Sequence, residues 1–191
     1  MNLPNKITIS RIIMVFIFLA ICNFDELIKD DFIQKVWRIT GFIFIILAAA
    51  TDVLDGYIAR KYNMVTDFGK LMDPLADKIF MVTAFIMLAD KQILPGWVAV
   101  VILSREFMVT GLRLLAANKG IVISADITGK IKTFVQMLFL VFGGSMWIGW
   151  ISPEYSKNIY WVIFYSAVAI FTVYSGVTYF YRHRNLYQDA S

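Results

Sequence analysis

Long apolar runs separated by short polar connections make up most of the chain. A helix needs about 20 mostly apolar residues to cross the hydrocarbon core of a membrane, and the six runs reach or approach that length. The connections leave no room for a second, soluble domain. The pattern therefore predicts an all-α integral membrane protein, a six-transmembrane-helix bundle forming one domain over residues 1–191, with spans at Ile9–Phe24, Trp37–Ala59, Leu75–Ala89, Pro95–Ala117, Ile127–Trp150 and Tyr160–Tyr181.

The distribution of basic residues predicts the orientation of this bundle. An even number of spans places both termini on one side, and Lys and Arg accumulate on the cytoplasmic side of membrane proteins. Thirteen of the 18 Lys and Arg fall on the side of the termini, and five fall on the other side. We therefore expect a multi-pass protein of the cytoplasmic membrane, with both termini in the cytoplasm.

Composition agrees with a membrane protein and narrows its function. Hydrophobic residues make up 59% of the chain, whereas soluble domains contain about 45–50%. The net charge of +4 follows from the excess of cations on the cytoplasmic side, so it gives no reason to expect a nucleic-acid partner. The chain nevertheless carries 14 Asp and Glu, and their positions indicate where chemistry is to be expected.

One acidic run lies on the non-cytoplasmic side, in the connection between the first two spans. Charge runs in loops are usually solvated, so we expect a hydrated loop here. A site for an ion is the alternative. The run comprises Asp25, Glu26, Asp30 and Asp31.

A second acidic group lies at the cytoplasmic ends of the second and third spans. Asp52 and Asp55 are three residues apart, and Asp73 and Asp77 are four apart, so each pair shares one face of a helix. Four unpaired carboxylates close together would repel one another, and hard divalent cations relieve that repulsion. Four carboxylates can also hold two metals, as in sites that stabilise both oxygens of a phosphoryl displacement. The alternative is a set of interhelical salt bridges with Arg60, Lys61 and Lys78.

The complete pattern is D-x2-D-G-x2-A-R-x8-G-x3-D-x3-D, formed by Asp52, Asp55, Gly56, Ala59, Arg60, Gly69, Asp73 and Asp77. It resembles the signature of the CDP-alcohol phosphotransferase family in all eight identities and all spacings, and the six-span architecture resembles that family as well. The resemblance implies that an alcohol hydroxyl attacks the β-phosphorus of a CDP-linked lipid and that CMP leaves. It further implies two divalent metals, Mg²⁺ or Mn²⁺, bound by the four aspartates.

The same resemblance implies roles for individual motif residues. Asp77 is expected to act as the general base that takes the hydroxyl proton. The CDP-lipid is expected to contact the first half of the motif and the glycine of the second half, at Asp52, Asp55, Gly56, Ala59, Arg60 and Gly69.

Cations along the fourth and fifth spans are candidates for binding a phosphorylated acceptor. Arg suits bidentate contact with phosphate, and Lys supplies a point charge. Arg105 lies well inside a span, where an unpaired charge is costly, so pairing with Glu106 or with another helix is its alternative role. For the lysines, the alternative is the cytoplasmic bias of basic residues. The candidates are Arg105, Arg113, Lys130 and Lys132.

Four further segments resemble bacterial members of this family that use CDP-diacylglycerol and glycerol 3-phosphate. They are Asn2–Thr8, Ser104–Phe107, Thr110–Arg113 and Gly129–Thr133. This likeness implies a bacterial membrane enzyme that contacts membrane lipids, and it implies that Asn5 and Thr8 contact the CDP-lipid. Inositol phosphate and serine remain alternative acceptors. A divalent-cation transporter is less favoured, because polar residues cluster in the cytoplasmic half.

The oligomeric state is also open at this level. The family resemblance suggests a homodimer, and small residues let helices approach closely. Gly143, Gly144 and Gly149 therefore fit either a contact between two copies or packing within one chain.

Overall fold

The computed structural model describes residues 3–61, 67–121, 123 and 127–185, and the side chains of residues 3–8, 11, 48–61 and 67–77 lie outside the described part. Across the described residues the secondary structure is helical and contains no strand, which confirms the predicted all-α class. The six α-helices are α1 (Leu3–Phe24), α2 (Asp31–Lys61), α3 (Asp67–Asp90), α4 (Gly96–Asn118), α5 (Ile127–Trp147) and α6 (Ile159–Arg182). Two short 3-10 helices, η1 (Asp25–Leu27) and η2 (Pro153–Lys157), lie in connections.

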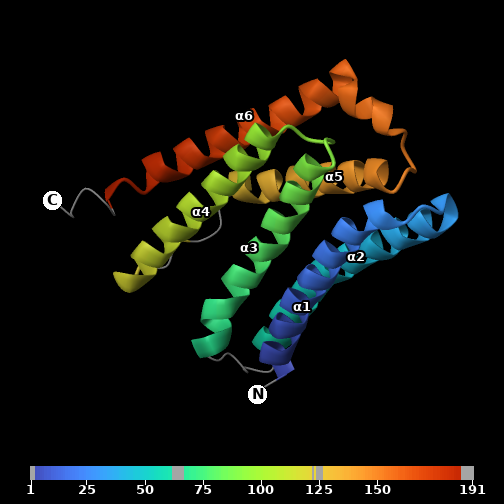
Figure 1. The fold of residues 1–191 in the computed structure, drawn as a ribbon. Coiled ribbons are helices and arrows are strands. Elements are labelled where there is room, and N and C mark those ends of the chain that lie inside the picture. The colour runs from blue at the N-terminus through green and yellow to red at the C-terminus, as the bar shows by residue number, and fades with distance from the viewer. Residues whose placement is uncertain (1–2, 62–66, 122, 124–126, 186–191) are drawn as a thin grey trace.

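Helix α3 is the central element of the bundle. It packs against the α1–α2 hairpin on one side and against α4 and α5 on the other, while α6 packs against α4 and α5 (Figure 1). Both α2 and α3 extend beyond the predicted spans, α2 beginning at Asp31 and α3 at Asp67. The helical backbone continues into polar sequence at these ends, so the connections are shorter than hydrophobicity alone predicts.

Two glycines determine how α4 and α5 end. Gly120 has φ +71° and Gly149 has φ +78°, a left-handed conformation that costs glycine little. The amides of Ile121 and Trp150 then donate to carbonyls five residues earlier, at Ala116 and Ser145. This is the Schellman arrangement, which satisfies the last carbonyls of a helix.

The apolar core lies along α3 and explains two of the small residues in α5. A Cβ atom on Gly144 would lie 2.2 Å from Cε2 of Phe42, and one on Gly143 would lie 2.7 Å from Cδ1 of Leu88. Both glycines are buried and let α5 approach α2 and α3. The structure therefore assigns Gly143 and Gly144 to packing within the chain, and Gly149 to a turn.

The acidic run at the end opposite the motif differs from the hydrated loop expected of it, because Asp25 is buried. Its carboxylate accepts hydrogen bonds from Nε of Arg38 (2.6 Å) and Nζ of Lys91 (3.0 Å). Nζ of Lys91 also donates to Glu26 (2.7 Å) and to the carbonyl of Cys22 (3.0 Å). Asp30 and Asp31 are exposed as expected. The prediction was wrong for Asp25 because cations from α2 and from the end of α3 converge on it.

The same contacts change the acidity of Lys91. Burial alone lowers the pKa of its ammonium, but the hydrogen bonds to Glu26 and Asp25, together with the negative charges of these two groups, outweigh burial. The pKa of Lys91 therefore lies above its ordinary value.

One helix of the described part, Ile159–Arg182, is long and apolar enough to cross a membrane by its length and composition. Charged side chains within other helices, such as Arg105, Glu106 and Arg113 in α4, reduce the apolar character of those segments.

Candidate active site

The eight motif residues fall on the two helices expected to carry them. Asp52, Asp55, Gly56, Ala59 and Arg60 lie in α2, and Gly69, Asp73 and Asp77 lie in α3. Helical backbone places residues three and four apart on a common face, so each aspartate pair shares a face as the spacing predicted. Helix α2 ends and α3 begins at the same end of the bundle, near the start of α1 (Figure 1).

The side chains of these eight residues, and those of Asn5 and Thr8, lie outside the described residues. Among the side chains that are described, no group of three His, Cys, Asp or Glu is placed to hold a metal. The four motif aspartates fit a divalent cation by their chemistry, because carboxylate oxygens are the ligands that Mg²⁺ and Mn²⁺ prefer.

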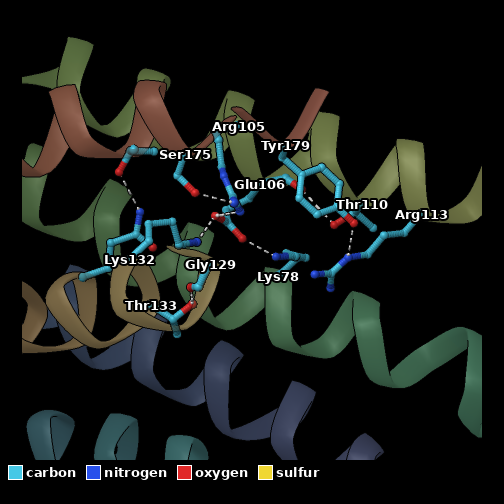
Figure 2. A network of polar contacts seen from close by, with 12 residues as sticks. Lys78, Arg105, Glu106, Thr110, Arg113, Gly129, Lys132, Thr133, Ser175 and Tyr179 are labelled. Atoms are coloured by element: carbon cyan, nitrogen blue, oxygen red, sulfur yellow. Dashed lines mark hydrogen bonds and ion pairs between the residues drawn. The ribbon is translucent and has the colours of Figure 1, made fainter. Parts of the chain in front are cut away.

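Next to the motif, a network of charged side chains centres on Glu106 of α4. The carboxylate of Glu106 accepts from Nζ of Lys78 in α3 and from Nζ of Lys132 in α5. It also accepts from Nη1 of Arg105 at 3.2 Å. Glu106 is buried, and Figure 2 shows its carboxylate lying between the cations. Three helices therefore direct cations at one carboxylate.

Arg105 is held in this network by α6 as well as by Glu106. Its Nη2 donates to Oγ of Ser175 at 3.0 Å. Its aliphatic part crosses Gly176, where a Cβ atom would lie 3.0 Å from Cγ of the arginine. Its Nε is buried and has no hydrogen-bond partner within the part of the chain that the structure describes. The structure thus confirms contact between Arg105 and Glu106, and leaves one donor of the guanidinium open.

The other predicted acceptor cations occupy different positions. Lys132 is buried within the network, whereas Lys130 is exposed and lies only two residues away, on a different face of α5. Arg113 lies two turns beyond Arg105, and its Nε donates to Oη of Tyr179 in α6 at 3.0 Å (Figure 2). The structure brings Arg105 and Lys132 together on Glu106, with Arg113 farther along α4 and Lys130 apart.

Sequence reasoning missed two members of this network. The sequence pattern indicates Lys78 only as a partner of the motif aspartates, and Glu106 only as a partner of Arg105. The available signal is that each charge lies within or beside an apolar run, where a charged side chain needs a partner, and its neighbour in the chain is not the only candidate. That signal does not say which helix supplies it.

Comparison with known proteins gives consistent results. The family model for CDP-alcohol phosphatidyltransferase matches residues 1–174. A Bacillus subtilis (strain 168) protein named CDP-diacylglycerol–glycerol-3-phosphate 3-phosphatidyltransferase is 41% identical over 185 residues, covering 94% of this chain and 93% of that protein. A Rickettsia typhi protein of the same name is 37% identical over 182 residues, covering 94% and 95%. A Mycobacterium tuberculosis protein named probable phosphatidylglycerophosphate synthase is 36% identical over 178 residues, covering 93% of this chain and 79% of its own length.

Proposed function

Because the chain belongs to the CDP-alcohol phosphatidyltransferase family, we propose that it transfers the phosphatidyl group of CDP-diacylglycerol to glycerol 3-phosphate. The products are phosphatidylglycerol phosphate and CMP, so the protein is a transferase of phospholipid biosynthesis. The observation that carries this proposal is the complete eight-residue motif on α2 and α3, in a chain that resembles its relatives over nearly its whole length.

The proposed reaction is a displacement at phosphorus. The acceptor hydroxyl forms a bond to the β-phosphorus of the CDP-lipid, the bond from that phosphorus to the bridging oxygen breaks, and CMP leaves with that oxygen. Asp77 takes the proton of the attacking hydroxyl. Asn5, Thr8, Gly56, Ala59, Arg60 and Gly69 lie along the CDP-lipid, together with Asp52 and Asp55.

The four aspartates of the motif hold the metal ions in this proposal. Two divalent cations, Mg²⁺ or Mn²⁺, supply positive charge that neutralises the pyrophosphate and the leaving phosphate when they are bound. Two of these ligands, Asp52 and Asp55, belong to α2, and the other two, Asp73 and Asp77, belong to α3.

The setting of the reaction is the cytoplasmic face of a bacterial membrane. Each of the six helices carries large apolar side chains that are exposed, which is unusual for a soluble protein and typical of contact with lipid. Examples are Phe16, Ile46, Ile86, Val100, Phe134 and Ile170. We place both termini and the motif on the cytoplasmic side, in a six-span protein that functions as a homodimer.

The decisive experiment identifies the acceptor. Purified protein is given CDP-diacylglycerol and Mg²⁺ with glycerol 3-phosphate, serine or an inositol phosphate, and release of CMP is measured for each. We expect CMP release with glycerol 3-phosphate and little with the other two. Preferred use of serine or inositol phosphate would replace the proposed acceptor, and no CMP with any of the three would refute the proposed transfer.

A further inference from the structure

We propose that Glu106 is a positioning residue for the acceptor, and that its carboxylate holds Lys78, Arg105 and Lys132 in the arrangement that binds the acceptor's phosphate. This inference rests on the proposed function, because it concerns one substrate of that reaction. It adds Glu106 and Lys78 to the residues that the motif and the apolar pattern indicate.

The charge of the network is the first argument. Among the described side chains, three cations share one carboxylate, so the group formed by Lys78, Arg105, Lys132 and Glu106 carries a net charge of +2. Excess charge that is buried is costly unless a counter-charge is present. A phosphate monoester carries a charge of about −1.5 to −2 at pH 7. The chemical class of ligand that matches the network is therefore a phosphorylated alcohol.

A hydrogen-bond donor of the network without a partner is the second argument. The side chain of Arg105 is nine-tenths buried, yet its Nε has no hydrogen-bond partner in the described structure. A phosphate oxygen would satisfy this donor and could also contact an ammonium. Lys78 gives access, because 23% of its side chain is exposed, compared with 3% for Lys132.

The position of Lys78 links the network to the site of chemistry. Lys78 directly follows Asp77 in α3, so its contact with Glu106 restrains the helical turn that carries the proposed general base. The phosphate and the attacking hydroxyl of glycerol 3-phosphate are only three carbons apart. One carboxylate can therefore position both the cations that bind the phosphate and the turn that receives the hydroxyl proton.

The test is the Glu106→Gln variant, because electrostatics and positioning predict opposite results. Removing a negative charge makes the network more positive, which by itself strengthens phosphate binding and lowers the KM for glycerol 3-phosphate. Loss of positioning separates the cations and raises that KM. We expect about a tenfold rise, with the KM for CDP-diacylglycerol changed less than about twofold. Inorganic phosphate, used as a competitor of glycerol 3-phosphate, should show the same loss of affinity.

Two further variants keep the result interpretable. Glu26→Gln removes an exposed carboxylate at the opposite end of the bundle and should leave both KM values unchanged. Glu106→Asp keeps the charge but is one methylene shorter, so it cannot reach all three cations. For Glu106→Asp we expect a rise in the KM for glycerol 3-phosphate of about threefold. If Glu106→Gln does not fold, Glu106→Asp provides the test.

The outcomes separate this inference from the function on which it rests. If wild-type protein uses glycerol 3-phosphate and the folded Glu106 variants leave its KM unchanged or lower it, the positioning role is refuted and the function stands. An equal rise in both KM values also refutes it, because that result indicates general disruption. If wild-type protein releases no CMP with glycerol 3-phosphate, the proposed function itself fails.

Discussion

Replacing Asp25 with Asn should destabilise the protein without disabling its site. The carboxylate is fully buried and accepts from Arg38 and Lys91. Removing one member of a buried ion pair costs about 3–5 kcal/mol. Arg38 keeps 29% of its side chain exposed and can recover hydration, so we expect a smaller loss, about 2–3 kcal/mol. For a chain of this size that corresponds to a melting temperature lower by about 4–12 °C.

The measurement is thermal unfolding of the detergent-solubilised protein, followed by tryptophan fluorescence. Trp37 is a suitable reporter, because its Nε1 donates to the carbonyl of Ile21 in the last turn of α1, four residues before Asp25. Glu26→Gln is the matched control: this carboxylate also contacts Lys91 but is 68% exposed, so its loss should cost less than about 1 kcal/mol. Equal melting temperatures for Asp25→Asn and Glu26→Gln would refute the argument that burial makes the loss of the Asp25 carboxylate more costly. CMP release at 25 °C should persist, because Asp25 lies at the end opposite the motif.

Four other outcomes are expected. Gly144→Ala should lower the free energy of unfolding by about 1–3 kcal/mol, because the added methyl group overpacks against Phe42, whereas Gly111→Ala, with open space around it, should not; equal melting temperatures for the two variants would contradict the packing. Arg113→Ala should raise the KM for glycerol 3-phosphate more than that for the CDP-lipid, and an equal rise would argue against a phosphate contact. A chelator should abolish CMP release and Mg²⁺ or Mn²⁺ should restore it, so chelator-resistant turnover would remove the metals from the proposal. Because the pKa of Lys91 is raised in the folded state, the stabilisation by its ammonium is complete below about pH 10 and is lost as pH rises through the folded pKa. The difference in melting temperature between wild type and Lys91→Met should therefore be constant from about pH 6 to 9 and shrink above about pH 10.4. A difference that stays constant at high pH would contradict this.

The helices and the sharing of faces within the motif could be predicted because both depend on local periodicity. Asp52 and Asp55 share a face of any helix that contains them, whatever that helix packs against. The end of α5 differs from the prediction: the expected span runs to Trp150 and treats Gly149 as a packing residue, whereas the helix ends at Trp147 and Gly149 takes a left-handed turn conformation.

The polar networks could not be predicted, because they depend on which helices are neighbours. Glu106 meets Lys78 and Lys132 from two other helices, 28 and 26 residues away in the chain. Asp25 is buried only because α2 and the end of α3 both reach it. A pattern of isolated charges indicates that partners are needed, whereas packing determines their identity.

Two lysines anchor helix α3: Lys78 within the helix contacts Glu106, and Lys91, the residue that follows its last residue, contacts Asp25. These lysines are 13 residues apart, which is about 20 Å along a helix. Inserting one residue between them would turn one anchor by about 100° relative to the other and shift it by about 1.5 Å. Substitution of the exposed Ile86 in α3 should therefore be tolerated far better than any change in the length of this helix, which sets the register between the two ends of the bundle.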